Sequence, residues 1–217
     1  MAKRCGMRSA TFLKFIRMSA FAVMAMLAFN TLPALASPDE AKAKLESLAT
    51  EALGHLSNKD KTREEQVALF RELMVKTFDL DLIAQFAVGR YWRRADDAEK
   101  KEYLSLFREY MVATYSVRLN EYDGESLKLV GARSTEQGGD VLVDTLITRD
   151  VDNLQLPVAW RMRKSGDKGY LVTDILVDNV SLAVAQRSEF VSVIRGNGGT
   201  LSGLNEKLRA RMAQSQS

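Results

Sequence analysis

Residues 177–194 read V-D-N-V-S-L-A-V-A-Q-R-S-E-F-V-S-V-I and join two kinds of secondary structure. The stretch begins as a strand, turns through the corner Asn179-Val180-Ser181-Leu182, and continues as a helix with little polar surface. The polar side chains of this helix are grouped at residues 186–189, between two apolar runs. Apolar surface beside one concentrated polar group is typical of a site for a ligand with a long apolar part and a charged end.

The segments before this corner change from helical to strand periodicity near Asp123-Gly124. Upstream, helices are predicted over 38–56, from Thr62 to about Phe78, over 79–88 and from Asp96 to about Glu121. Strands are predicted over 126–132, 141–148, 154–164 and 170–178, and a last helix follows Gly199. Helices, then an antiparallel meander, then helices again predict the α+β class, with helices packed on a curved four-stranded antiparallel sheet.

Three helix starts carry capping residues. Thr62 and Glu65 form the pattern of a capping box, and Asp96 with Glu99 repeats it. Asp79 suits the N-cap of the short helix, and Gly89 suits its C-terminal end. These residues predict where the helices begin and end.

The first 36 residues have the pattern of a secretory signal peptide rather than of a folded segment. A basic start is followed by the apolar run 18–29 and by the small-residue cleavage pattern Ala34-Leu35-Ala36. The apolar run is shorter than the roughly 20 residues that a membrane-spanning helix needs. We therefore predict a cleaved leader at 1–36 and one exported, soluble domain at 37–217, with an uncleaved membrane anchor as the alternative.

The charge and the cysteine content of the chain change when this leader is removed. Five of the 31 basic residues and none of the 28 acidic ones lie in it, so the rest of the chain has 26 basic and 28 acidic residues. This balance does not favour a nucleic-acid-binding protein. The single cysteine, Cys5, also lies in the leader, so no disulfide, thiolate nucleophile or zinc-thiolate site is expected in the domain.

Catalytic and metal-binding patterns are weak in this chain. The single histidine, His55, is expected at a solvated surface position, and neither a phosphate-binding loop nor a nucleophile motif is present. One enzymatic alternative is a small-molecule enzyme of a cone-shaped fold, with Asp144 as an inward-facing general base. The competing interpretation places Asp144 on the solvent face of an edge strand.

Two long motifs resemble those of a known family. The runs N-V-S-L-A-V-A-Q-R-S-E-F at 179–190 and F-D-L-D-L-I-A-Q-F-A-V-G-R-Y-W-R at 78–93 are similar to those of MlaC-type periplasmic phospholipid carriers, the toluene-tolerance family. The resemblance implies a cone like that of nuclear-transport-factor-like folds, with a hydrophobic cavity between sheet and helices. It also implies a soluble periplasmic shuttle that helps to maintain outer-membrane lipid asymmetry.

The same resemblance implies a ligand and two partners. The ligand is a phospholipid, and no further cofactor or metal is implied. The partners are an outer-membrane lipoprotein complex and the inner-membrane MCE-domain protein of an ABC transporter, which consumes the ATP. In this chain Asp178-Asn179 stands where an acidic residue and glycine are commoner, which puts the geometry of the corner in doubt.

Candidate site residues follow from the apolar faces and from the resemblance. Residues expected to line a lipid-tail pocket are Leu80, Ile83, Phe86, Phe107, Met111, Val143, Val158, Trp160, Ile175, Val177, Val180, Leu182 and Phe190. Periodicity alone does not separate such a pocket from an ordinary filled core. Candidates for head-group or partner contact are Arg90, Trp92, Arg93 and Arg187, because guanidinium groups match phosphate oxygens. The alternative is fold maintenance: Trp92 anchors the core, and Arg90 and Arg187 pair with structural carboxylates such as Asp79 or Glu189.

Overall fold

The computed structural model describes residues 37–56, 60–117, 124–136, 139–149 and 151–214. The predicted signal peptide at 1–36 lies outside these residues, and so does the predicted end of the longest helix, 118–121. The described part contains helices together with an antiparallel sheet, which confirms the α+β class. None of its helices is long and apolar enough to cross a membrane.

Six α-helices are present in the described residues, and their caps explain where they begin. They are α2 (Pro38–Leu56), α3 (Arg63–Thr77), α4 (Leu80–Val88), α5 (Asp97–Ser116), α6 (Leu182–Gly196) and α7 (Leu201–Gln214), with the 3₁₀ turn η1 (Gly89–Tyr91) after α4. Both predicted capping boxes are confirmed, at Thr62 with Glu65 and at Asp96 with Glu99. Asp79 caps α4 by accepting the Leu82 N–H at 3.1 Å.

The sheet is an antiparallel meander in the order β1-β2-β3-β4-β5. Its strands are β1 (Ser126–Ser134), β2 (Asp140–Arg149), β3 (Leu154–Lys164), β4 (Tyr170–Val177) and β5 (Val180–Ser181), and the 3₁₀ turn η3 (Gly166–Lys168) joins β3 to β4. The register pairs Met162 with Val141 and Trp160 with Val143, so the alternating face predicted on β3 meets the apolar face of β2.

The predicted number of strands, four, was wrong by one. Strand β5 pairs Val180 with Val177 and Ser181 with Leu176 across the turn Asp178-Asn179. Both turn residues have positive φ, 49° and 65°, a conformation that Asp and Asn tolerate better than most residues and that a two-residue hairpin needs. A two-residue strand is too short to show alternation, so the sequence indicated a corner there.

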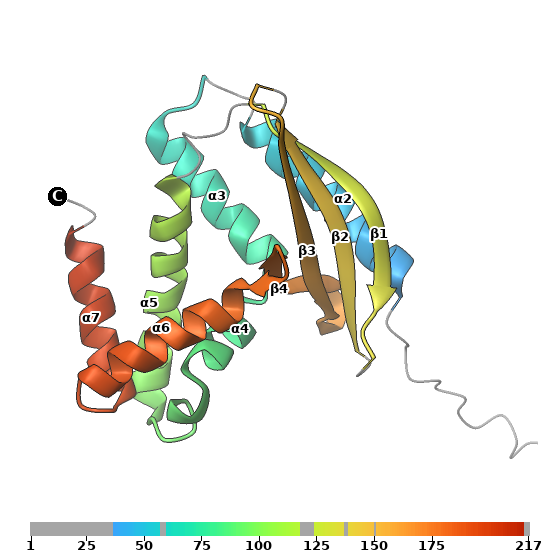
Figure 1. The fold of residues 1–217 in the computed structure, drawn as a ribbon. Helices are drawn as coiled ribbons and strands as arrows, with labels where there is room; N and C mark the ends of the chain where they lie inside the picture. Colours follow the sequence, from blue (N-terminus) through green and yellow to red (C-terminus); the bar gives the residue numbers. More distant parts are fainter. Residues whose placement is uncertain (1–36, 57–59, 118–123, 137–138, 150, 215–217) are drawn as a thin grey trace, which may run out of the picture. The chain divides into compact units, whose positions relative to one another are not determined.

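The buried side chains form two clusters. One lies among α4, α5, α6 and α7, where Phe190 meets Phe107 edge to face with ring centroids 6.1 Å apart and Tyr110 at 5.5 Å. The other joins Ala41 and Leu45 of α2 to the inner face of the sheet. Figure 1 shows α3 crossing between α5 and the sheet, so that the space between the two clusters is bounded by α2, α3 and the strands.

Candidate functional site

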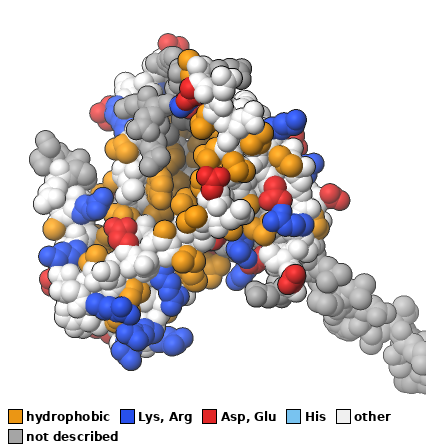
Figure 2. All heavy atoms as spheres, viewed as in Figure 1, with side chains coloured by type: hydrophobic (Ala, Val, Ile, Leu, Met, Phe, Trp, Pro, Cys, Tyr) orange, Lys and Arg blue, Asp and Glu red, His pale blue; other side chains and the backbone are white. Residues whose placement is uncertain are grey.

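A cavity of about 600 Å³ occupies the space between α2, α3 and the inner face of the sheet. This volume falls within the range of about 300–1,000 Å³ that is usual for small-molecule sites. Its apolar wall consists of Leu45, Leu48, Ala49, Ala52, Leu53, Leu69, Phe70, Leu73, Met74, Phe78, Ile83, Met111, Leu127, Ile147, Trp160, Ile175, Leu182 and Ala183. Figure 2 shows hydrophobic side chains gathered in the recess between α3 and the sheet.

Two hydrogen bonds hold Trp160 in the part of the wall that the sheet forms. The Trp160 indole N–H donates to the Thr145 hydroxyl oxygen at 3.0 Å, and that hydroxyl donates to the Val158 carbonyl at 3.0 Å. The first bond satisfies the one polar atom of the indole, its N–H, and the second satisfies the hydroxyl of the buried Thr145. The face of the indole stays available to the cavity.

Polar side chains line the cavity near the C-terminal end of α2 and the start of β1. Arg149 donates to Glu125 at 2.9 Å and to Asp152 at 2.7 Å, and Arg149 and Glu125 both line the cavity. The hydrogen bond from Arg149 holds the pKa of Asp152 below its ordinary value. Gln66 lies at the same end, and so does His55, which was expected on the surface but is half-buried in the cavity wall. A cation and a carboxylate thus lie side by side at one end of an apolar space.

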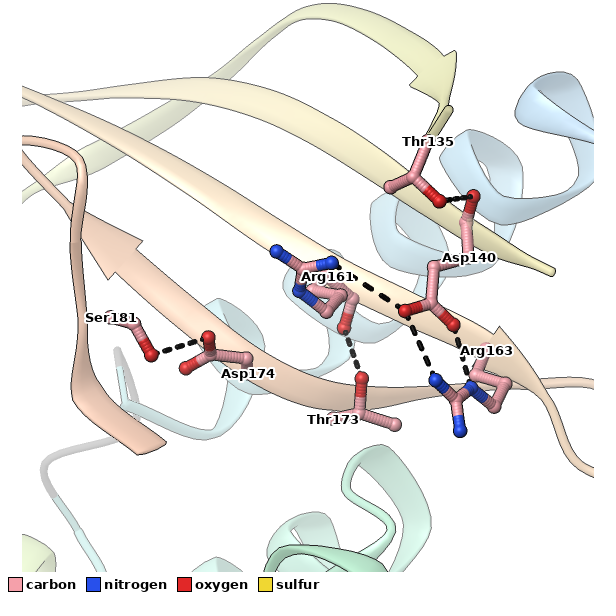
Figure 3. A network of polar contacts seen from close by, with 7 residues as sticks. All are labelled: Thr135, Asp140, Arg161, Arg163, Thr173, Asp174 and Ser181. Atoms are coloured by element: carbon pink, nitrogen blue, oxygen red, sulfur yellow. Dashed lines mark hydrogen bonds and ion pairs between the residues drawn. The ribbon is translucent and has the colours of Figure 1, made fainter. Parts of the chain in front are cut away.

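A second polar group lies where β4 meets α6. Asp174, which lines the cavity, accepts from the Ser181 hydroxyl at 2.6 Å and from the Ala183 N–H at 3.0 Å. Figure 3 shows the first of these contacts beside the Arg161–Asp140–Arg163 ion pairs of the neighbouring strands. Ser181 in turn caps α6 by accepting the Val184 N–H at 3.0 Å. These contacts hold the strand-to-helix corner in place.

Five of the predicted tail-pocket residues line the cavity: Ile83, Met111, Trp160, Ile175 and Leu182. The other eight lie elsewhere. Five of these are buried in the two core clusters or in the sheet: Leu80, Phe107, Val143, Val158 and Phe190. Phe86 and Val180 are 40% and 61% exposed, and Val177 is half-buried beside β5.

The four predicted head-group residues lie outside the cavity wall. Arg90 and Arg93 are exposed, while Trp92 is half-buried with its ring centroid 6.4 Å from that of Tyr103. Arg187 lies over the Phe86 ring at 5.1 Å and donates to the Phe86 carbonyl at 3.3 Å. The four residues therefore belong to the surface formed by α4, η1 and α6.

Sequence reasoning missed the contribution of α2 and α3 to the cavity. Leu48, Leu69, Phe70 and Leu73 line it, and all four were assigned to ordinary helix packing or not singled out. Helical spacing was the available signal, but it is identical for a stripe that faces a core and a stripe that faces a cavity.

Asp144, the candidate general base, does not line the cavity. It is ion-paired with Arg133 across β1 and β2, in a position that is about one-third exposed. This placement on the outer face of the strand leaves the enzymatic alternative without its proposed base. Within the described ranges, no group of three or more His, Cys, Asp or Glu side chains has an arrangement that could hold a metal ion.

Comparisons with known proteins agree with this architecture. The family model described as MlaC protein matches residues 46–210. Among solved structures, the phospholipid-binding protein from Ralstonia solanacearum in complex with a phospholipid is similar, with a TM-score of 0.71 and 21% sequence identity. The similarity covers 82% of this chain and 99% of that one, and it establishes a shared fold. None of the curated proteins compared with the chain matches it.

Proposed function

Because this chain belongs to the MlaC family, we propose that it is a phospholipid carrier that holds acyl chains in the cavity between α2, α3 and the sheet. The observation that carries the proposal is the cavity itself, which combines about 600 Å³ of space with an almost continuous wall of Leu, Ile, Met, Phe and Trp side chains. The complex of the similar Ralstonia protein with a phospholipid supports it.

The energetics of lipid tails explain why a carrier needs such a space. Removing a methylene from water is worth about 0.8 kcal/mol, so an acyl chain of about 15 methylenes carries on the order of 12 kcal/mol. A phospholipid therefore leaves a membrane as a free monomer only rarely. A protein that takes the tails inside offsets this cost without any covalent step.

The head group belongs at a polar end of the cavity, because burying it unpaired in the apolar part would cost far more than burying the tails returns. The end formed by Arg149, Glu125 and Gln66 offers both a cation and a carboxylate. A phosphate matches the guanidinium of Arg149, and an ammonium group matches the carboxylate of Glu125. This pairing suits a zwitterionic head group without requiring one.

The transport role follows from the family and from the predicted leader. We propose that the protein is exported to the periplasm and shuttles phospholipid between an outer-membrane lipoprotein complex and an inner-membrane ABC transporter. Its contact there would be the MCE-domain protein of the transporter, and the work would maintain outer-membrane lipid asymmetry.

Two substitutions on α3 test the cavity assignment. Leu73 lines the cavity, whereas Val75 lies two residues further along the same helix and is 57% exposed. We expect Leu73→Asp to lose most of the phospholipid that co-purifies with the wild type, because a carboxylate in the apolar wall opposes tail burial. Val75→Asp should keep it. Native mass spectrometry of protein purified from periplasmic extracts measures the bound lipid.

A second variant separates loss of the cavity from loss of the fold. Leu73→Trp fills part of the space without adding charge, and we expect it to retain the wild-type circular dichroism spectrum but to carry less lipid. Full lipid loading in folded Leu73→Asp would exclude this cavity as the tail site. A wild type that carries no lipid and takes none from vesicles would contradict the carrier function itself.

A further inference from the structure

Five arginines on η1, on the segment before α5 and on α6 have no carboxylate partner among the described residues. They are Arg90, Arg93, Arg94, Arg187 and Arg195, and none takes part in an ion pair within 4.0 Å in that part of the chain. By contrast, several arginines on other elements pair with carboxylates, as Arg108 does with Asp81 and Arg209 with Glu102. We call these five residues the arginine face.

The carboxylates near the arginine face are engaged elsewhere. Asp81 pairs with Arg108, Asp97 pairs with Lys100, and Asp96 caps α5. Glu189 of α6 accepts a hydrogen bond from Gln186 at 3.4 Å. Figure 2 shows Lys and Arg side chains gathered over α6 and the connection between α4 and α5. Among the described residues, no carboxylate therefore forms a direct ion pair with a guanidinium group of this face.

Contacts with aromatic rings hold part of the arginine face in position. Arg90 donates to the Tyr91 hydroxyl at 3.2 Å, and the hydrogen bonds from Arg90 and Arg195 hold the pKa of Tyr91 below its ordinary value. Arg187 lies over the ring of Phe86. The guanidinium groups of the turn η1 and the helix α6 thus converge around two aromatic rings.

Exposed apolar side chains accompany this charge. Phe86, Val180 and Val184 are 40%, 61% and 56% exposed, and they lie on α4, on β5 and in the first turn of α6, respectively. Cations combined with exposed apolar side chains are typical of proteins that bind at the interface of an anionic membrane. A guanidinium group also matches phosphate oxygens in pairs, which a compact ammonium does not.

We propose that the arginine face, with Phe86, Val180 and Val184, docks the protein on the surface of a bilayer that contains anionic phospholipid. The attraction is local, because the chain after residue 36 has 26 basic and 28 acidic residues and no overall positive charge. The face adjoins the cavity: Ile83 and Gln186 line the cavity, and Phe86 and Arg187 follow them on the same two helices. This docking function goes beyond lipid carriage and does not require it.

A pair of double variants tests the proposal. Arg93→Gln with Arg94→Gln removes two exposed cations of the face whose guanidinium groups make no hydrogen bond or ion pair with the described residues. Lys128→Gln with Lys168→Gln removes the same charge from exposed positions on β1 and η3. The measurement is co-sedimentation with vesicles of phosphatidylcholine alone and of phosphatidylcholine mixed with phosphatidylglycerol, at low and high salt.

We expect the wild type to sediment with the anionic vesicles and not with the zwitterionic ones, and to dissociate as salt is raised. The arginine double variant should bind about 30-fold more weakly, and the lysine double variant should bind like the wild type. Val184→Ser should weaken binding several-fold through the lost apolar contact.

Several results would overturn the docking proposal. The first is equal binding of the wild type to both kinds of vesicle, and the second is equal weakening of binding by the two double variants. The third is a wild type that does not sediment with vesicles but binds an acidic protein surface. A failure of the carrier proposal can be told apart from a failure of the docking proposal. Folded Leu73→Asp should lose its bound lipid and still sediment with anionic vesicles. The arginine double variant should conversely keep its bound lipid in native mass spectrometry.

Discussion

The guanidinium group of Arg187 packs directly against Gly89 at the C-terminal end of α4. Gly89 has φ of +53°, and a Cβ there would lie 2.7 Å from the Arg187 Nη2 atom. The guanidinium also lies over the Phe86 ring and donates a hydrogen bond to the Phe86 carbonyl, in the last turn of α4. The two residues are therefore expected to act together in stability.

We predict that Arg187→Ala lowers the free energy of unfolding by about 1 kcal/mol, from the lost hydrogen bond and the lost cation–π contact. Gly89→Ala should cost more, because it adds backbone strain and displaces the guanidinium. In the double variant the two effects should not add, since each change already breaks the same contact. Urea unfolding of the four proteins measures this, and additivity within about 0.5 kcal/mol would show that the residues are independent.

The helices α2 and α3 are held together at the cavity by an ion pair between Glu51 and Lys76. Both elements supply apolar side chains to the cavity wall, so the pair joins two sides of the candidate site. The hydrogen bond from Lys76 lowers the pKa of Glu51 from its ordinary value. The contribution of the Glu51 ion pair to the packing of α2 against α3 therefore depends on pH.

The sign of the pH effect follows from the direction of the shift. Because the pKa of Glu51 is lower in the folded protein than in the unfolded chain, its stabilising effect is present above the unfolded pKa of about 4.3 and is lost as the pH falls through the folded pKa. We predict that Glu51→Gln slightly lowers the urea midpoint at pH 7 and leaves it unchanged well below pH 4. Exposed ion pairs contribute little, so the effect should be small. A difference in urea midpoint between the wild type and Glu51→Gln that stays the same well below pH 4 would contradict the ion pair.

At the scale of the whole molecule, a cavity of about 600 Å³ inside the domain makes stability depend on its contents. A ligand that binds the folded protein and not the unfolded chain raises the unfolding temperature by mass action. We predict that removing bound lipid by detergent exchange lowers the midpoint of thermal unfolding, and that adding phospholipid vesicles restores it. Differential scanning calorimetry measures both steps.

The variants at the cavity provide the control for this prediction. Leu73→Trp should show a smaller shift on removal of lipid, because the indole occupies part of the space. Val75→Asp, on the exposed side of the same helix, should behave like the wild type. Equal shifts in all three proteins would mean that lipid stabilises the molecule from somewhere other than the cavity.

Most of the fold could be predicted from the sequence, because its signals are local. The capping boxes at Thr62 and Asp96 and the alternation of β3 depend on residues a few positions apart, and the helix and strand bounds follow from them. The fifth strand was missed because two residues show no period. Its turn at Asp178-Asn179 forms with positive φ at both positions, so the departure from the commoner acidic residue and glycine does not prevent the corner from closing.

The candidate site could be predicted only in part, because a cavity is a property of packing. Periodicity correctly indicated apolar faces, yet Phe107 and Phe190 fill the helical core while Leu48 and Leu73 line the cavity. Nothing in the spacing of these residues distinguishes the two outcomes, since both require the same stripe on a helix. The arginines likewise look alike in sequence, and only their surroundings separate Arg108, which has a carboxylate partner, from Arg93, which has none among the described residues.

The sequence by itself thus determined the class of fold, the approximate positions of most elements and the resemblance to a family, because these depend on near neighbours and on motif identity. The stretch 177–194 marked the point where sheet becomes helix, and the structure shows its Asp174–Ser181 and Arg187–Phe86 contacts anchoring that point. The tertiary structure alone decided which apolar stripes enclose the cavity and which arginines have no ion-pair partner among the described residues. Both depend on where atoms distant in the chain come to lie, and that information is not local.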